Sequence, residues 1–209
     1  MPRKAIGLFV EDSAHDTIIR EIVKRVSREH GVDVRIESAG MTGNVLHGHG
    51  NVLKEFRQYV GSLKSYGQKK HYDLLIVALD ANCHGFNERF KEIREVSDAA
   101  AGYLNVEIVC AVPDPHIERW LLLDAEAFKQ ALGRGCEATT YKCERGRYKK
   151  LLRMAVFDAL KMWPPLGGLE YSPKIIGAQN FERLRTEHKD FAEFINALYG
   201  KFREWMAEQ

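Results

Sequence analysis

Carboxylates follow two apolar stretches of the sequence, and their side chains could hold a metal ion. Residues 74–79 form an uninterrupted apolar run that is followed by Asp80 and Asn82, and Glu11 ends a second run over residues 5–10. Such runs are typical of strands that are buried on both faces of a parallel sheet. Ligands of open α/β sheets bind just beyond the carboxyl ends of the strands. We therefore expect the Glu11 and Asp80 carboxylates to lie within roughly 8 Å of each other, close enough to share one ion.

Each of these acids also has a structural interpretation that the sequence leaves open. Asp80 could cap a turn, and Glu11 could simply precede a helix. Carboxylates that crowd together without a metal repel one another. If the two residues form a metal site, Asp80→Asn should therefore leave the fold intact, whereas a structural cap would not tolerate the change.

The remaining elements alternate between strand and helix patterns up to about residue 133. This order predicts a doubly wound, mostly parallel sheet with helices on both faces. The glycine-rich stretch over residues 40–50 lacks the Gly-Lys-Ser/Thr ending of a phosphate-binding P-loop, and we interpret it as a mobile loop. The expected elements are a helix capped by Ser13 and ended by Gly31, a strand over 32–37, a helix from Asn51, a helix over 86–101, a strand over 106–112 and a helix over 117–124.

Beyond residue 133 the pattern is helical only. Helices are expected over residues 148–162, 173–187 and 189–207, and Pro164-Pro165-Leu166-Gly167-Gly168 separates the first two. We therefore predict an α/β domain over residues 1–133 and a helical C-terminal region over residues 134–209 that packs on it.

Composition is that of a soluble globular protein, with 45% apolar and 29% charged residues. The net charge is only +2, so any nucleic-acid affinity must come from a local basic patch. The densest basic stretch runs from Lys142 to Arg153, and its alternative interpretation is a solvated helix start. The candidate phosphate-binding side chains in it are Arg145, Arg147, Lys149 and Lys150.

Cysteine usage and hydropathy bear on the location of the protein. The four cysteines, at positions 83, 110, 136 and 143, have no zinc-like spacing, and we expect reduced thiols with Cys110 in the core. No window approaches the roughly 18 apolar residues of a membrane span, and no signal peptide is evident. The sequence therefore predicts a cytoplasmic protein without a membrane partner.

Several short motifs together resemble small Toprim-domain proteins related to OLD-type nucleases, a group linked with bacterial antiphage defence. Val10-Glu11 is similar to the strand-ending Glu of that family, and residues 79–82 (Leu-Asp-Ala-Asn) are similar to its Asp-x-Asp motif, with Asn82 in place of the second Asp. Residues 115–124 (Pro-His-Ile-Glu-Arg-Trp-Leu-Leu-Leu-Asp) match a more specific pattern, Pro-x-x-Glu-x-Trp-Leu-Leu-x-Asp. Residues 171–174 (Tyr-Ser-Pro-Lys) are similar to a C-terminal lysine-containing segment.

The resemblance implies a Mg²⁺- or Mn²⁺-dependent nuclease with two bound ions. Glu11 would be a metal ligand and general base, and Asp80 the ligand that bridges the ions. Asn82 would ligate only through its carbonyl, and the second ligand after Glu11 stays open between Asp12 and Asp16. Two further roles follow from the same motifs: Glu118 as the second-metal ligand and Lys174 as the lysine that steadies charge on the phosphate, although either could be an ordinary helix residue.

Two other functions compete with the nuclease. A degenerate Toprim-like regulatory or adaptor subunit, working with an ATPase or another effector, would explain Asn82. A receiver-like signalling domain would explain the apolar runs that end in Glu11 and Asp80, but the later strand lacks the Lys-Pro ending of receivers. The expected partner of the nuclease is DNA or RNA, and a second copy of the chain is a further candidate.

Overall fold

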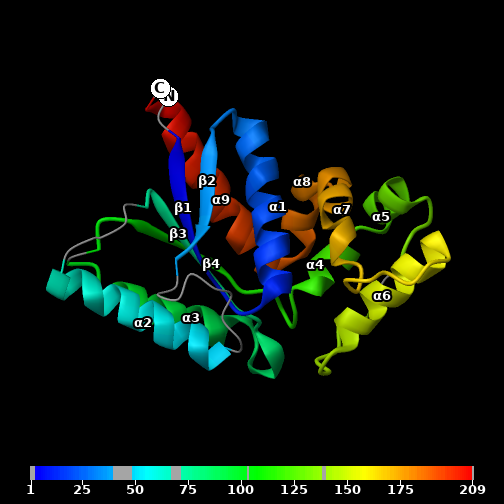
Figure 1. Ribbon diagram of the computed structural model, residues 1–209, viewed down its shortest axis with the longest axis horizontal. Helices are drawn as coiled ribbons and strands as arrows, with labels where there is room; N and C mark the ends of the chain where they lie inside the picture. Colours follow the sequence, from blue (N-terminus) through cyan, green and yellow to red (C-terminus); the bar gives the residue numbers. More distant parts are fainter. Residues whose placement is uncertain (1–2, 40–48, 67–71, 103, 138–139, 209) are drawn as a thin grey trace.

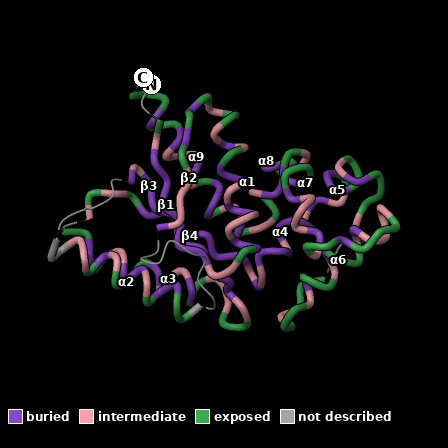
Figure 2. The backbone as a smooth tube through the Cα atoms, viewed as in Figure 1, coloured by how far each residue is buried: buried purple, intermediate pink, exposed green. Residues whose placement is uncertain are grey.

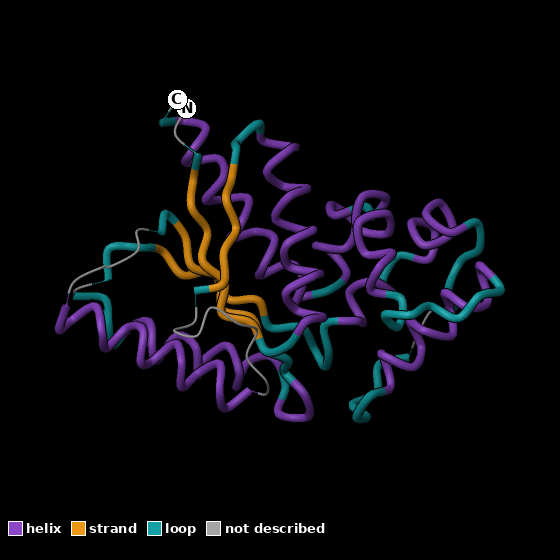
Figure 3. Tube along the Cα trace, viewed as in Figure 1, coloured by secondary structure: helices purple, strands orange, loops and turns teal. Residues whose placement is uncertain are grey.

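A four-stranded, all-parallel sheet lies at the centre of the computed structural model, which describes residues 3–39, 49–66, 72–102, 104–137 and 140–208. The strands are β1 (Lys4–Val10), β2 (Val34–Ser38), β3 (Leu74–Ala78) and β4 (Glu107–Ala111). Their order in the sheet is β2-β1-β3-β4, so that β1 and β3 are neighbours (Figure 1). Helices flank the sheet on both sides (Figure 3), which confirms the predicted α/β fold.

Two hydrophobic clusters cover the two faces of the sheet, because successive side chains of a strand point to opposite faces. Phe9 and Val77 face α2 (His49–Tyr66) and α3 (Phe86–Asp98) on one side. Ile6 and Ile76 face α1 (Ser13–His30) and α9 (Lys189–Ala207) on the other. Strands β1, β3 and β4 are buried over nearly their whole length, whereas most of the edge strand β2 and the outer faces of the flanking helices are partly or fully exposed (Figure 2).

The C-terminal helices share the larger of these clusters with the sheet. The remaining helices are α4 (Glu118–Leu122), α5 (Ala125–Leu132), α6 (Arg147–Leu160), α7 (Ser172–Ala178) and α8 (Phe181–Glu187). Trp120 of α4 stacks on Phe194 of α9, with ring centroids 5.6 Å apart, and meets Phe191 edge-on. The helical region therefore completes the hydrophobic core beside α1, while the boundary at residues 133 and 134 stays a prediction.

Two local predictions are wrong for reasons that the backbone explains. Asp12, and not Ser13, caps α1, because its extended backbone lets Oδ1 accept hydrogen bonds from the Ala14 and His15 amides (2.9 and 3.1 Å). The helix expected over residues 173–187 is two helices, because the backbone of Gln179 is extended between α7 and α8.

The register of the sheet brings the two predicted carboxylates to one edge. Val10 pairs with Ala78 at the end of the β1–β3 ladder, so Glu11 and Asp80 follow neighbouring strands at the carboxyl edge. Most of the glycine-rich stretch, residues 40–48, lies outside the described residues. Within the part of the chain that the structure describes, no helix combines the length and the apolar character needed to cross a bilayer.

Candidate metal centre at the carboxyl edge of the sheet

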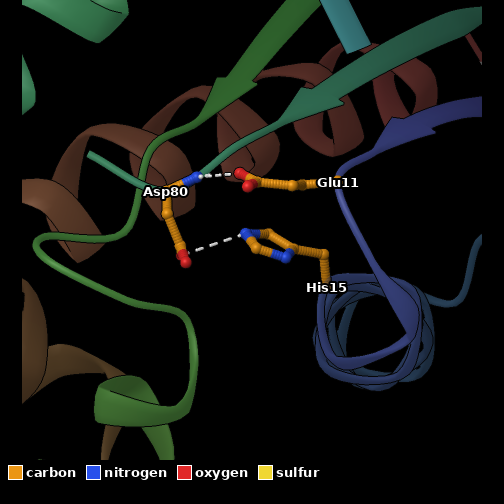
Figure 4. Close-up of side chains that lie close together, drawn as sticks. All are labelled: Glu11, His15 and Asp80. Carbon is orange, nitrogen blue, oxygen red and sulfur yellow. Dashed lines mark hydrogen bonds and ion pairs between the residues drawn. The ribbon is translucent and has the colours of Figure 1, made fainter. Parts of the chain in front are cut away.

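Glu11 and Asp80 meet just beyond the ends of β1 and β3 (Figure 4). Glu11 Oε2 accepts a hydrogen bond from the Asp80 backbone amide (3.1 Å). One side-chain atom from each of Glu11, His15 and Asp80 lies within 4.8 Å of the other two. The expectation that the two carboxylates lie within roughly 8 Å of each other is therefore confirmed. The Glu11 and Asp80 carboxylate oxygens are therefore close enough to contact a single ion.

His15 is the member of this group that the sequence did not indicate. It lies in the first turn of α1 and is fully buried, with Nδ1 2.9 Å from Asp12 Oδ1 and Nε2 3.1 Å from Asp80 Oδ1. Burial alone would lower the pKa of His15, but the charge of Asp80 and the hydrogen bond to Asp12 outweigh it and raise the pKa to about 10. The side chain is therefore an imidazolium between two carboxylates at neutral pH.

The Asp80 carboxylate is held from three directions. Oδ1 accepts a hydrogen bond from the Ile117 amide (2.8 Å), and Oδ2 lies 3.0 Å from His116 Nδ1. Burial opposes ionisation, yet the nearby His15 charge and the bond to His116 lower the pKa of Asp80. The same hydrogen bond raises the pKa of His116. Asp80 is thus a fixed, ionised carboxylate that lies beside the His15 imidazolium and the His116 ring.

Glu118 lies at the start of α4 and faces Lys149 of α6, and its role as a ligand of a second ion stays a prediction. Its side chain is buried, and Oε2 has no hydrogen-bond partner among the described residues. Burial, reinforced by the charge of Asp80, raises the pKa of Glu118. Lys149 Nζ lies between Glu118 Oε1 (3.6 Å) and Asp12 Oδ2 (3.1 Å). The lysine therefore joins α6 to the acidic group.

Three other predicted residues take different positions. Asp16 forms an ion pair with Arg20 along α1, with Nε and Oδ2 2.8 Å apart. Asn82 starts a short 3₁₀ turn, and its side-chain amide donates a hydrogen bond to the backbone carbonyl oxygen of Asp80 (3.3 Å). Lys174 is exposed on α7. Among the residues that the structure describes, it makes no contact with the acidic group. Its catalytic role stays a prediction.

The predicted phosphate-binding residues occupy the start of α6 and the loop before it. Arg145 and Lys150 are exposed, and Arg147 is half-buried with a guanidinium nitrogen 4.0 Å from Glu144 Oε2. Lys149 instead points toward Asp12 and Glu118, so its charge stabilises the acids of the site. Nucleic-acid binding by the four residues stays a prediction.

The expectation that all four cysteines are reduced thiols is wrong for two of them. Cys83 and Cys143 form a disulfide, with Cα atoms 5.6 Å apart. Cys110 is free and buried in the core, as predicted, and Cys136 is also free. Cys83 lies in the 3₁₀ turn after Asp80, so the bond fixes the segment that leads into α6 beside the site. Disulfides are typical of oxidising compartments, and a cytoplasmic location therefore stays a prediction.

Removing this bond should lower stability measurably. The disulfide closes a loop with a sequence separation of 60 residues. Loop-closure entropy predicts a loss of about 4 kcal/mol in the free energy of unfolding for the Cys83→Ser, Cys143→Ser double variant. Urea unfolding without reductant measures the loss, and added dithiothreitol should destabilise the wild type but leave the double variant unchanged. Equal effects of dithiothreitol on both proteins would contradict the bond.

The chain has no match among the protein-family models, curated proteins or solved structures with which it was compared.

Proposed function

We propose that the protein is a divalent-metal-dependent phosphodiesterase that hydrolyses DNA or RNA, of the Toprim type that the sequence motifs resemble. The observation that carries this proposal is the meeting of the Glu11 and Asp80 carboxylates at the carboxyl edge of a parallel sheet, with side-chain oxygens within 4.8 Å of each other. Binding sites of open α/β sheets lie at this edge. A role in antiphage defence, with an ATPase or another effector, belongs to the same proposal.

The side chains of the site fit a divalent ion in part. Glu11 Oε2 accepts a hydrogen bond from the Asp80 backbone amide. Among the described residues, Glu11 Oε1 takes part in no hydrogen bond or ion pair. Glu118 contributes the buried, unpartnered Oε2. Carboxylate oxygens are the ligands that Mg²⁺ and Mn²⁺ prefer. Glu11 and Asp80 would therefore hold a first ion, and Glu118 is the candidate for a second.

The surrounding residues would position this chemistry. A bound divalent ion would supply a Lewis acid and lower the pKa of a water molecule for attack on phosphorus. The Ile117 amide and His116 hold the Asp80 carboxylate in one orientation. Lys149, which approaches from α6, would place a positive charge where the phosphate enters and would stabilise charge that develops on it.

A cleavage assay with a matched variant tests this function. The wild type should cleave single-stranded or duplex nucleic acid with Mg²⁺ or Mn²⁺ and not in EDTA. Glu11→Gln removes one ligand charge and should lower the rate at least about 100-fold, since loss of an outer-shell partner alone costs 10–100-fold. Glu126→Gln, which changes an exposed glutamate in the first turn of α5, should leave the rate unchanged. Metal-independent cleavage, or full activity of Glu11→Gln, would contradict the proposal.

One observation favours the second candidate, a non-catalytic regulatory subunit. His15, His116 and Lys149 already offset the acidic charges of the site without a metal. A subunit of this kind would bind its effector but show no metal-dependent cleavage. The same assay separates the two functions, because the regulatory subunit predicts no activity with any metal and no difference between Glu11→Gln and the wild type.

A further inference from the structure

An aromatic pair with one exposed member, Trp163, lies at the end of α6 that is remote from the acidic site. Trp163 is 50% exposed and stacks on Phe157, with ring centroids 4.2 Å apart and an angle of 21° between the planes. The Arg153 guanidinium carbon lies 4.8 Å from the centroid of the Trp163 ring. Both contacts come from α6, and the exposed half of the Trp163 side chain offers a flat surface for another planar group.

The loop that carries Trp163 is held firmly against the helix. Gly168 packs so closely on α6 that an added Cβ would lie 2.9 Å from Leu152 Cγ. Glu170 accepts hydrogen bonds from the Leu166 and Gly168 amides (3.3 and 3.0 Å). The aromatic surface is therefore preformed, and binding to it would cost little ordering of the chain.

Basic residues join this surface to the acidic site along one face of α6. Lys150, Arg153 and Phe157 are spaced three and four residues apart, which places them on the same side of a helix. Lys149 at the start of this stripe reaches Asp12 in the site. The helix itself carries four basic residues and one acidic residue, and it runs from the site toward the outer edge of the molecule (Figure 1). At 1.5 Å per residue, residues 149–160 span about 17 Å.

We propose that this face of α6 binds single-stranded nucleic acid, with a base stacked on Trp163 and the phosphates along Arg153 and Lys150. The inference rests on the proposed nuclease function, of which it names the substrate class. Stacking on an exposed ring requires a base that has left its own stack, which a single strand offers and a duplex does not. The positive stripe matches the phosphate charge and leads the strand toward the acids at the sheet edge.

Trp163 provides the measurement. The other two tryptophans, Trp120 and Trp205, are buried, so stacking of a base should quench the fluorescence of Trp163. The experiment titrates the wild type with a single-stranded oligonucleotide in EDTA, so that binding is measured without any cleavage. We expect Trp163→Ala to weaken binding about 5- to 150-fold, and Trp163→Phe to retain most of the affinity because the ring remains. Met206→Ala, an exposed apolar residue of α9, is the matched control and should bind like the wild type.

The outcomes separate this inference from the proposed function. A wild type that binds no single strand in EDTA, or Trp163→Ala that binds as well as the wild type, would overturn the inference and leave the surface as an apolar contact for a protein. Arg153→Gln should also make the slope of log K against log salt shallower by about 0.7 if the arginine contacts one phosphate. Quenched binding without metal-dependent cleavage would support this surface while it contradicts the nuclease.

Discussion

Replacing Asp80 with asparagine should lower the free energy of unfolding by about 3–5 kcal/mol at pH 6 in EDTA. The Asp80 carboxylate accepts a hydrogen bond from the Ile117 backbone amide (2.8 Å). It also lies 3.1 Å from His15 Nε2 and 3.0 Å from His116 Nδ1. An uncharged amide would leave the buried His15 imidazolium with Asp12 as its one remaining carboxylate contact of that length among the residues that the structure describes. Removal of one partner from a buried ion pair typically costs this much. Urea unfolding of Asp80→Asn and the wild type measures the difference.

A surface ion pair gives the control for this prediction. Glu95→Gln breaks the exposed pair between Glu95 and Lys91 along α3 and should cost no more than about 1 kcal/mol. The double variant of Asp80→Asn with His15→Gln should be less destabilised than the two single changes together, because the residues interact directly. Equal stability of Asp80→Asn and the wild type would show that the carboxylate does not compensate the histidines.

Stability should fall as the pH rises from about 6.5 to about 10. The folded state raises the pKa of His15 from 6.5 to about 10, because Asp80 and Asp12 stabilise the protonated ring. A raised pKa gives a contribution that is fully present below pH 6.5 and is lost as the pH passes through the folded value. At about 1.4 kcal/mol per pKa unit, the loss is on the order of 5 kcal/mol. Urea unfolding in EDTA at pH values from 6 to 10 measures this slope.

The stability at low pH and a variant that lacks His15 make the pH prediction specific. The folded state lowers the pKa of Asp80 below 3.8, so this contribution is present above that pH and is lost as the pH falls through the folded value. Stability should therefore be highest between about pH 4 and 6.5. His15→Gln keeps a polar side chain but cannot titrate, and its stability should vary much less above pH 6.5. A slope in His15→Gln equal to that of the wild type would assign the pH dependence to other groups.

The parallel sheet and the meeting of Glu11 with Asp80 could be predicted because both follow from local pattern. The apolar runs over residues 5–10 and 74–79 indicated buried strands, and the carboxyl ends of parallel strands lie at the same edge of a sheet. His15 could not be predicted in the same way, since a histidine in a helix start has no mark of burial. The spacing of Asp12 and His15 was the available signal, because residues three apart share a helix face.

Contacts between distant parts of the chain lay beyond the sequence. Lys149 reaches Asp12 across a separation of 137 residues, and Cys83 bonds to Cys143 across 60. No periodicity encodes such pairs. For this reason the sequence favoured a repulsive, metal-dependent Asp80 whose replacement is harmless, whereas the structure surrounds Asp80 with two histidines and predicts that Asp80→Asn is costly. The break between α7 and α8 was missed because residues 173–187 contain no internal proline.

The central claim is that Glu11 and Asp80 hold a divalent ion, and a crystal soaked with Mn²⁺ tests it most directly. The account predicts an anomalous difference peak at the carboxyl edge of the sheet, about 2.0–2.6 Å from oxygens of both carboxylates. The peak should be absent from crystals of Glu11→Gln soaked in the same way. A wild-type crystal without a peak there, in which Asp80 still contacts His15 and His116, would contradict the metal centre and with it the proposed nuclease.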